Sequence, residues 1–300
     1  MAAGEEQTAS GPSLDAVPVC GLMLASAKLG GLEVGDGFPV RVMAAINLSP
    51  ESFYAGSVAV TEDALRKQAD EAMREGADIV DVGAMSTAPY LATRISEEEE
   101  IQRLAPAIRA VRRAAPLPIS ADTTRSRVAA AALNEGATVI NDVTGFRGDP
   151  GMAAVAARAR GVVLMASETS PGAGDPIATT RSLLVDSCRR AAEAGIASNR
   201  IVLDPGIGFF RAAAIPWWEW DRDILRRLSE LRSLGRPLLV GPSRKSFIGK
   251  LVDRPDPADR LPGSLAATVV AVLNGAHMIR THDVRATRDA VRMAEALRPV

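Results

Sequence analysis

Cysteine and histidine are scarce in this sequence, and its net charge is close to zero. The 300 residues include two cysteines and two histidines, and the formal net charge at pH 7 is −1. Cys20 and Cys188 lie far apart without a Cys-x-x-Cys pair, so neither a disulfide framework nor a zinc site is indicated. The sequence is also not basic enough to favour nucleic acid as a partner. We therefore expect a protein of a reducing, cytoplasmic compartment.

Long apolar runs are missing as well. The run over residues 17–27 is too short to cross a bilayer, and no Lys or Arg precedes it, unlike the start of a signal peptide. These absences predict no membrane partner. What is present, 47% hydrophobic and 24% charged residues, is the composition of a globular protein with an ample core.

The chain begins with a segment of low complexity. Residues 1–16 are rich in Gly, Ser and Ala and predict a disordered tail before a single domain over residues 17–300. Residues 17–41 alternate short apolar runs with two glycine-containing turns, which is typical of a hairpin. We expect this hairpin to plug one end of the structure that follows.

A unit consisting of a short apolar run, a loop and an amphipathic helix then repeats eight times. The apolar runs are residues 42–46, 79–82, 118–121, 138–140, 162–165, 201–203, 238–240 and 277–279. The helical patterns are residues 62–75, 97–114, 126–135, 152–160, 179–194, 221–234, 264–274 and 285–297. This alternation predicts an α/β fold, a TIM (β/α)8 barrel with an N-terminal hairpin plug, rather than a doubly wound sheet.

Polar side chains stand at the carboxyl ends of nearly all these strands. In chain order the strand-end residues are Asn47, Asp81, Asp122, Asn141, Met165, Asp204, then Ser243, Arg244 and Lys245, and finally Arg280 and His282. In a TIM barrel the carboxyl ends of the strands meet at the face where active sites are built. The sequence therefore predicts a polar pocket at this face.

Asp204 is the most informative of these residues. Three aliphatic residues before it suit a buried strand, while Pro205, Gly206 and Gly208 stop that strand and allow a close approach of the backbone to a ligand. A buried carboxylate is costly unless it is paired, which favours a ligand-binding role. The alternative is that Asp204 caps the next helix.

The predicted pocket contains no covalent machinery. It has no Cys nucleophile, no Ser/His/Asp set and no Walker-type phosphate loop. It offers a carboxylate and amide face opposite a cationic face, which are Asp81, Asp122, Asn141 and Asp204, and Arg244, Lys245, Arg280 and His282. Such a pocket suits a flat heterocycle with a guanidine-like donor edge and anionic oxygens at its far end. Catalysis would then consist of positioning and charge neutralisation.

Eight short motifs, one for each strand, resemble those of the dihydropteroate synthases and the wider pterin-binding barrel family. They are Ile46-Asn47-Leu48-Ser49-Pro50-Glu51-Ser52-Phe53, Asp81-Val82-Gly83 followed by Ser86-Thr87, Ser120-Ala121-Asp122-Thr123, Ile140-Asn141-Asp142-Val143, Leu164-Met165, Asp204-Pro205-Gly206-Ile207-Gly208-Phe209, Ser243-Arg244-Lys245-Ser246-Phe247-Ile248-Gly249 and Arg280-Thr281-His282-Asp283-Val284. Each motif alone is weak, but eight in order are specific.

The resemblance implies a transferase that joins 6-hydroxymethyl-7,8-dihydropterin diphosphate to an arylamine, with Mg2+ as cofactor and release of pyrophosphate. It also implies that the protein is a homodimer and that its other binding partners are these small-molecule substrates. Carried over by position, the pterin-binding residues are Asp122, Asn141, Met165, Asp204, Phe209, Lys245 and Arg280. The diphosphate or amine would contact Thr87, Ser243, Arg244 and His282, with Asn47 at the metal and Lys245, Arg280 and His282 as the catalytic residues.

Departures from the family pattern lie on the loops after the first two strands. Ala55 follows Tyr54 where the family has Ser-Asp-Gly-Gly, and Ala88 stands where the family has Arg, for which Arg94 or Arg211 could substitute. These loops resemble the archaeal and methylotroph branch of tetrahydromethanopterin biosynthesis, whose amine is a ribofuranosylaminobenzene phosphate instead of p-aminobenzoate. Neutral drift within a folate enzyme is the alternative.

Three further alternatives stay open at this point. A methyltransferase acting between a methylated pterin and a corrinoid protein would use the same pterin-binding groups, and a non-catalytic pterin-binding paralogue would need no amine. Trp217, Trp218 and Trp220, after the sixth strand, either form a wall for the aryl group or make a packing contact.

Overall fold

A computed structural model describes residues 24–48, 61–85, 95–167, 174–210 and 214–298 of the chain. Its centre is an eight-stranded parallel sheet in the order β8-β7-β6-β5-β4-β3-β10-β9. The strands are β3 (Arg41–Asn47), β4 (Ile79–Gly83), β5 (Ile119–Asp122), β6 (Val139–Asp142), β7 (Gly161–Met165), β8 (Ile201–Asp204), β9 (Leu239–Val240) and β10 (Met278–Thr281). A parallel bridge between Leu203 and Leu238 joins the two edge strands and closes the barrel. The predicted TIM barrel is confirmed.

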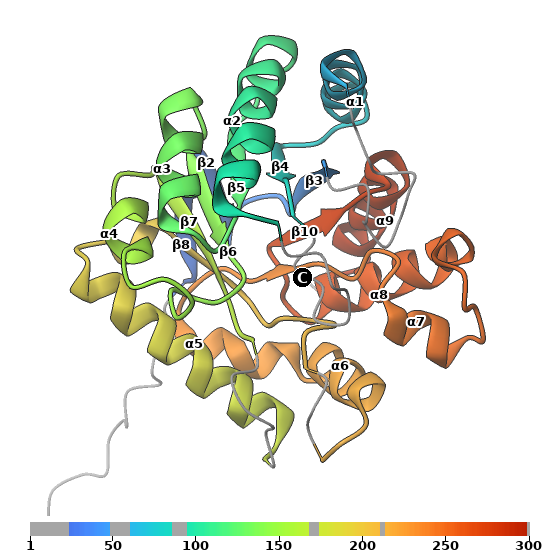
Figure 1. Cartoon of the computed structure of the whole chain (residues 1–300). Helices are drawn as coiled ribbons and strands as arrows, with labels where there is room; N and C mark the ends of the chain where they lie inside the picture. Colours follow the sequence, from blue (N-terminus) through green and yellow to red (C-terminus); the bar gives the residue numbers. More distant parts are fainter. Residues whose placement is uncertain (1–23, 49–60, 86–94, 168–173, 211–213, 299–300) are drawn as a thin grey trace, which may run out of the picture.

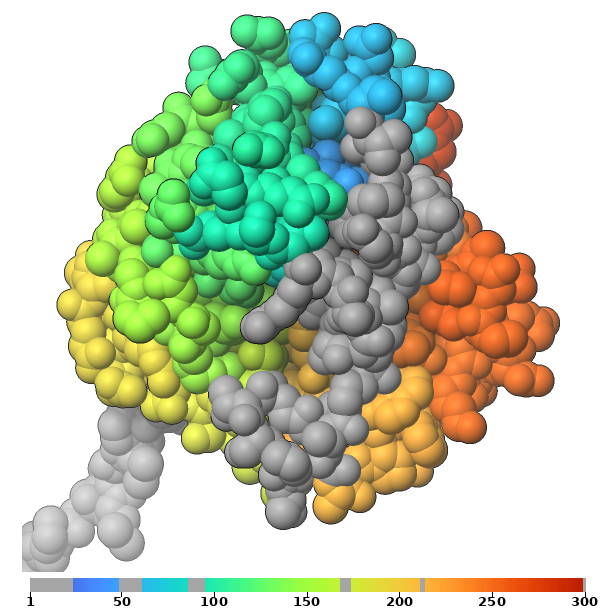
Figure 2. All heavy atoms as spheres, in the orientation of Figure 1, coloured from blue at the N-terminus to red at the C-terminus, as the bar shows by residue number. Residues whose placement is uncertain are grey.

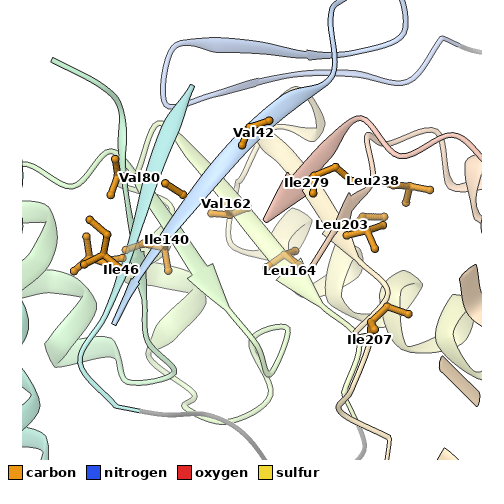
Figure 3. Close-up of a cluster of buried hydrophobic side chains, with 14 of the residues drawn as sticks. Val42, Ile46, Val80, Ile140, Val162, Leu164, Leu203, Ile207, Leu238 and Ile279 are labelled. Atoms are coloured by element: carbon orange, nitrogen blue, oxygen red, sulfur yellow. The ribbon is translucent and has the colours of Figure 1, made fainter. Parts of the chain in front are cut away.

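Alternation along each strand separates the two faces of the barrel wall. Residues of one parity point outward and form a continuous apolar core with the helices, as the stick side chains of Val42, Val80, Ile140, Val162, Leu203 and Ile279 illustrate (Figure 3). Residues of the other parity point into the barrel, where a separate apolar layer consists of Met43, Ile79, Val139, Val163, Val202, Leu239 and Met278. The barrel interior is thus filled by side chains at this level.

The N-terminal hairpin closes the amino-terminal end of the barrel, as predicted. Strands β1 (Ser26–Leu29) and β2 (Leu32–Gly35) pair antiparallel, and three of their apolar side chains belong to the inner apolar layer: Ala27, Leu29 and Val34. The carboxylate of Asp36 fixes the hairpin, since it accepts a hydrogen bond from the Ala25 amide (2.9 Å) and lies 3.2 Å from Nε2 of His277. The predicted tail, residues 1–16, lies outside the described residues.

Helices surround the barrel in chain order, with colours that run from blue-green to red around the molecule (Figure 1), and the colours of the space-filling view follow the same order (Figure 2). They are α1 (Glu62–Arg74), α2 (Glu97–Ala114), α3 (Ser126–Glu135), α4 (Met152–Ala156), α5 (Pro176–Glu193), α6 (Trp217–Arg226), α7 (Ser246–Leu251), α8 (Leu261–Leu273) and α9 (Val284–Ala296), with short 3-10 turns η2 (Ser198–Arg200), η3 (Leu228–Leu234) and η4 (Pro257–Arg260). None of the helices described is long and apolar enough to span a membrane.

Helix α4 is shorter than predicted. It ends at Ala156 because the following amides bond three residues back, as in Arg158 N to Val155 O (3.1 Å) and Ala159 N to Ala156 O (3.0 Å). The tryptophan segment belongs to a helix, not to a loop. Trp220 is fully buried and stacks on Phe210, with ring centroids 4.6 Å apart, so the packing interpretation is confirmed for this residue.

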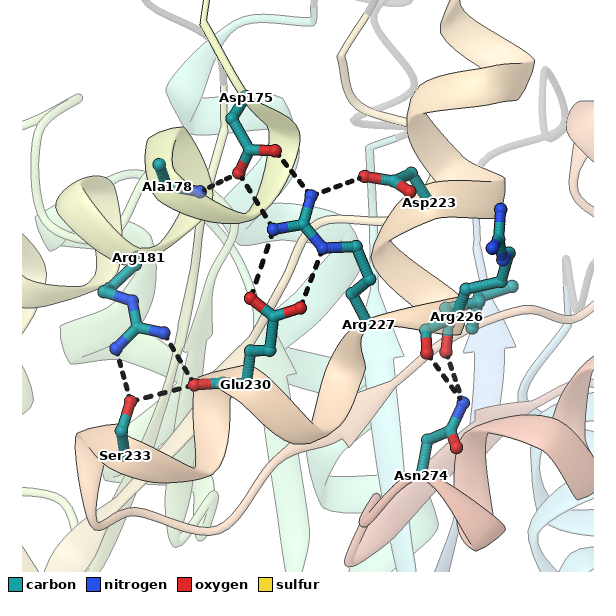
Figure 4. Close-up of polar contacts among 10 residues, drawn as sticks. Asp175, Ala178, Arg181, Asp223, Arg226, Arg227, Glu230, Ser233 and Asn274 are labelled. Carbon is teal, nitrogen blue, oxygen red and sulfur yellow. Dashed lines mark hydrogen bonds and ion pairs between the residues drawn. The ribbon is translucent and has the colours of Figure 1, made fainter.

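An arginine links three elements at the edge of the barrel near α5 and α6. Arg227 donates to Glu230 of η3, to Asp223 of α6 and to Asp175, which caps the start of α5 by accepting from the Ala178 amide (Figure 4). The pKa of Asp175 lies below its ordinary value, because its ionised carboxylate accepts hydrogen bonds from Arg227 and from the Ala178 amide. The cluster therefore fixes the helices on either side of β8.

Candidate active site

The polar strand-end residues form a layer inside the barrel, one step above the inner apolar layer. Each lies two residues after an inward-facing apolar residue of its own strand, as Asp81 does after Ile79 and Asp204 does after Val202. The members of this layer on β4, β6, β7, β8 and β10 are Asp81, Asn141, Met165, Asp204 and Arg280; Asp122 lies at the same end of β5. Period-two geometry therefore brings together the predicted pterin-binding residues of five strands.

Arg280 connects this layer across the barrel. Its Nε donates to Oδ2 of Asp81 (2.7 Å) and its Nη2 donates to Oδ2 of Asp122 (3.1 Å). Strand β3 lies between β10 and β4, and its residue paired with Asp81 is Ala45, whose small side chain leaves room for the guanidinium. Arg280 is thus held by two carboxylates of neighbouring strands.

Asp81 was predicted for the carboxylate and amide face of the pocket, but it was not among the residues predicted to bind the pterin or to be catalytic. It is fully buried, and Oδ2 also accepts from Nδ2 of Asn141 (3.2 Å), so it fixes both Arg280 and Asn141. The sequence contained a signal for it, since Asp81 is a strand-end carboxylate five residues after Gly76, in the same position as Asn141 after Gly136 and Arg280 after Gly275. These three glycines all have positive φ after a helix.

Burial controls the ionisation of the two carboxylates predicted to bind the pterin. Burial and the nearby negative charge of Asp81 raise the pKa of Asp122 to about 7, although Arg280 opposes this shift. Burial also raises the pKa of Asp204 to about 6, against the Gly206 amide and the positive charges of Lys245 and Arg280. Oδ1 of Asp122 is buried and finds no hydrogen-bond partner among the described residues. Both groups favour a ligand that donates hydrogen bonds or positive charge.

The turn after β8 fixes the side chain of Asp204, the last residue of that strand. The alternative that Asp204 caps the next helix is wrong. Oδ1 of Asp204 accepts from the Gly206 amide (2.8 Å), whereas the next helix, α6, begins only at Trp217. Gly206 has φ +78°, and a Cβ atom there would lie 2.0 Å from the carbonyl oxygen of Ala166. Only glycine fits this turn.

Lys245 lies against the same turn. A Cβ atom on Gly208 would come within 3.0 Å of the lysine Cδ, and the Lys245 ammonium lies 4.6 Å from the ring centroid of Phe209. The Gly208 amide donates to Oδ1 of Asp221 on α6 (2.8 Å), which fixes the turn from outside. The structure therefore brings Lys245 and Phe209 together, next to the turn that carries Asp204.

His282 forms a chain of contacts with two other predicted residues. Its Nε2 lies 3.3 Å from Nδ2 of Asn47, and its Nδ1 lies 3.0 Å from Oγ of Ser243. Because the Asn47 amide nitrogen can only donate, the imidazole accepts at Nε2 and carries its proton at Nδ1. Burial lowers the pKa of His282 to about 3, and the positive charges of Arg280, Lys245 and Arg244 add to this effect. The same concentration of positive charge attracts an anion.

Asn47 supplies the only predicted protein ligand for a metal. No group of three or more His, Cys, Asp or Glu side chains suited to a metal occurs within the described part of the chain. Mg2+ commonly binds through one or two protein oxygens together with substrate phosphates and water, and the Asn47 amide oxygen fits that arrangement. The described residues thus suit a Mg2+ ion that arrives with a diphosphate, not one held by a protein cage.

Arg244, which was predicted to contact the diphosphate or the amine, is bonded to groups of the protein itself. Its guanidinium donates to both oxygens of Asp283 (2.8 and 2.7 Å) and to the carbonyls of Pro257 and Ala258 (2.9 and 2.7 Å). The arginine is 5% exposed, so it is an internal anchor between η4 and the turn before α9. Its guanidinium is occupied by these contacts because their geometry uses four of its N–H groups.

Several residues of the sequence prediction lie outside the described residues, among them Thr87 and the substituted positions Ala55 and Ala88. Arg94 and Arg211, named as possible substitutes for the family arginine, lie outside them too. The predicted contacts of these residues stay predictions.

Comparison with known proteins identifies the class. Residues 43–282 match the family model described as pterin binding enzyme. A dihydropteroate synthase from Synechocystis sp. is 40% identical over 264 residues, which cover 85% of this chain and 89% of the relative. The chain therefore belongs to the pterin-binding enzyme family.

Solved structures agree with this assignment. The dihydropteroate synthase of Xanthomonas albilineans with 4-aminobenzoic acid has a TM-score of 0.82 and 35% identity, covering 92% of this chain and 99% of that one. The same enzyme in complex with 7,8-dihydropteroate has a TM-score of 0.79 at the same identity and coverage. These relatives confirm the prediction of a transferase of the dihydropteroate synthase type.

Proposed function

We propose that this chain condenses 6-hydroxymethyl-7,8-dihydropterin diphosphate with p-aminobenzoate and releases pyrophosphate. The observation that carries the proposal is the set of strand-end carboxylates and amide, Asp122, Asn141 and Asp204, next to three basic residues: Arg280 bonds Asp122 (3.1 Å), Lys245 lies against the turn after Asp204, and His282 follows β10. Dihydropteroate in a related structure and 4-aminobenzoic acid in another support these substrates.

The pterin ring binds through its donor edge. Its amino group and ring N–H donate to the carboxylates of Asp122 and Asp204. Burial raises the pKa of both carboxyl groups, so their ionised forms are costly unless a ligand donates hydrogen bonds to them. Asn141 supplies an amide, Lys245 donates to the ring carbonyl, and Met165, which is 2% exposed, packs against the ring. Phe209 lies beside the Lys245 ammonium and restricts its position.

The reaction needs no protein nucleophile. The amine nitrogen forms a bond to the exocyclic methylene carbon, the bond from that carbon to the diphosphate oxygen breaks, and its electron pair leaves with pyrophosphate. The amine nitrogen loses a proton, which the departing pyrophosphate takes up. Arg280 and His282 neutralise the charge that builds on the leaving group. Mg2+ bound to the diphosphate oxygens and to Asn47 would add positive charge at the same place.

The diphosphate and His282 affect each other. In the free protein burial and, after it, three nearby cations hold the imidazole neutral, with its pKa lowered to about 3. A diphosphate placed beside them offsets their charge, so it raises the pKa of His282 and favours an imidazolium, whose positive charge attracts the diphosphate. Ser243 orients the ring from Nδ1, which keeps Nε2 directed to Asn47. In this proposal Arg244 supports the site through Asp283 instead of binding the substrate.

The choice of amine rests on the relatives. Those named above are bacterial dihydropteroate synthases, and one is solved with 4-aminobenzoic acid. We therefore favour p-aminobenzoate over the ribofuranosylaminobenzene phosphate expected for a tetrahydromethanopterin branch. The two widely separated cysteines support a cytoplasmic location.

We also propose that the active form is a homodimer. Helix α8 carries no charged residue and exposes Val270 and Leu273, while neighbouring α9 exposes Met293 and is followed by the exposed Leu297. A helix that is apolar all round is normally covered by other protein. A second copy of the chain could cover this face, because two copies that each carry a net charge of −1 repel each other little. Sedimentation of Val270→Glu as a monomer, beside a dimeric native chain, would support this arrangement.

Pyrophosphate release tests the reaction directly. The native chain and Asp204→Asn are compared with the dihydropterin diphosphate, Mg2+ and either p-aminobenzoate or its ribofuranosyl phosphate derivative. Release with p-aminobenzoate supports the proposal, and release with only the ribosylated amine assigns the tetrahydromethanopterin branch. Silence with both contradicts the synthase and leaves the corrinoid methyltransferase or a non-catalytic paralogue, which methyl transfer to a corrinoid protein separates.

A further inference from the structure

Glu100 is a buried carboxylate behind the active site. It belongs to the acidic first turn of α2, in which Ser96 caps the helix by accepting from the Glu99 amide (3.1 Å). The side chains of Glu97, Glu98 and Glu99 are 31%, 66% and 44% exposed, whereas that of Glu100 is 1% exposed. Favourable charge at a helix start accounts for exposed acids, but it does not explain why one is buried at a cost.

Both oxygens of Glu100 are used by the segment that follows Asp122. Thr123 Oγ1 donates to Oε1 (2.7 Å), and Arg125 Nη1 donates to Oε2 (2.8 Å). Arg125 also donates from Nη2 to the carbonyl of Ile95 (2.9 Å), just before α2. The carboxylate therefore joins the start of α2 to the turn after β5.

The threonine in this network adjoins the candidate pterin-binding carboxylate. Thr123 is 1% exposed, its amide donates to the carbonyl of Asn141 (3.1 Å), and its hydroxyl accepts from the Arg125 amide (3.3 Å). The backbone at Thr123 is thus held from three sides. Since Asp122 immediately precedes it, the direction of the Asp122 side chain is fixed by the same contacts, with Arg280 as its side-chain partner.

We infer that Glu100 is a positioning residue for the pterin-binding carboxylate of Asp122 and acts through the hydroxyl of Thr123. This inference rests on the proposed function. Partners behind a ligand-binding group restrict its orientation, and their loss commonly weakens binding without removing any contact to the ligand.

Charge provides a second route between the two carboxylates. The negative charge of Glu100 raises the pKa of Asp122, as do Asp81 from β4 and Asp142 from β6, while Arg280 from β10 lowers it. Because pterin binding uses ionised Asp122, removing the charge of Glu100 should extend binding to lower pH. Loss of the hydrogen bond and loss of the charge therefore have different signatures.

The test uses 6-hydroxymethylpterin as binding probe, together with steady-state pyrophosphate release. Thr123→Val keeps the shape of the side chain but removes the hydroxyl, and we expect it to raise the Kd of the probe and the KM of the pterin substrate about tenfold while kcat changes little. Thr123→Ser should restore both. Glu100→Gln should shift the acid limb of probe binding to lower pH. Glu98→Gln, on the exposed side of the same turn, is the matched control and should match the native chain.

Three outcomes would overturn the inference. If Thr123→Val and Glu100→Gln lower the thermal midpoint but leave Kd, KM and the pH profile at native values, Glu100 has a structural role only. Failure of Thr123→Ser to restore affinity contradicts a role for the hydroxyl, and the threonine variants decide the question even where Glu100→Gln does not fold. A native chain that neither binds the probe nor releases pyrophosphate refutes the proposed function itself, and the inference with it.

Discussion

Replacing Asp204 with asparagine should weaken catalysis and stabilise the fold at the same time. Asp204 is 9% exposed, and burial raises the pKa of its carboxyl from 3.8 to about 6. A carboxyl whose pKa is higher in the folded state binds its proton more tightly there than in the unfolded chain. Its contribution to stability is therefore complete below pH 3.8 and is lost as the pH rises through about 6.

The size of this loss follows from the two pKa values. Linkage gives a cost of ionising Asp204 of about 1.5 kcal/mol at pH 5 and about 3 kcal/mol at pH 8. Asparagine carries no charge, and its side-chain oxygen can still accept from the Gly206 amide. Relative to the native chain, Asp204→Asn should therefore gain roughly 1.5 kcal/mol of unfolding free energy between pH 5 and pH 8.

Urea unfolding of both chains at pH 5 and pH 8 measures this gain, and pyrophosphate release measures the loss of activity, which should reach about a hundredfold because a charged acceptor of the pterin is lost. Asp186→Asn on α5, with a side chain that is half exposed, controls for the general effect of removing one negative charge. A relative stability of Asp204→Asn that stays constant or falls from pH 5 to pH 8 would refute the reasoning.

Three other replacements test a carboxylate that positions Arg280, a basic residue of the site and a glycine of the turn after β8. Asp81→Asn removes the shortest hydrogen bond of Arg280 in the site. It should lower kcat/KM for pyrophosphate release about ten- to a hundredfold, measured at a pH where the fold of the variant is intact. His282→Ala should weaken binding of the pterin diphosphate several-fold but leave 6-hydroxymethylpterin unaffected, as isothermal titration of the two ligands would reveal. Gly206→Ala should lower the unfolding free energy by about 2 kcal/mol or more, measured in urea, because its Cβ would collide with the carbonyl of Ala166.

The barrel could be predicted because each of its strands carries its own local signal. All eight predicted runs coincide with barrel strands to within two residues, since a strand buried on both faces must be apolar and a turn must end it. Helices α2 and α3 have the predicted bounds, whereas α7 was missed. Six residues are too few to display a helical period, so only its packing in the folded chain stabilises α7.

Membership of the polar layer was also predictable, but its internal pairing was not. Strand-end position and period two place Asp122, Asn141, Asp204 and Arg280 on the inner face. That Arg280 bonds Asp81 and Asp122 depends on how far β10 lies from β4 and β5, and on the small size of Ala45 between them. These are distances across the barrel, which spacing along the chain does not contain.

Arg244 and Lys245 illustrate the same limit between two neighbouring residues. The sequence places both on the cationic face of the predicted pocket, because both are cations after the same strand. The backbone separates them: Arg244 has φ +52° and directs its guanidinium to Asp283 and to two carbonyls, while Lys245, in extended conformation, lies against Gly208 and Phe209. Arg244 is thus bonded to a carboxylate and to backbone carbonyls, whereas Lys245 lies beside a glycine and an aromatic ring. The two neighbouring cations therefore have different surroundings, which the sequence did not distinguish, although both of their charges, with that of Arg280, lower the pKa of His282.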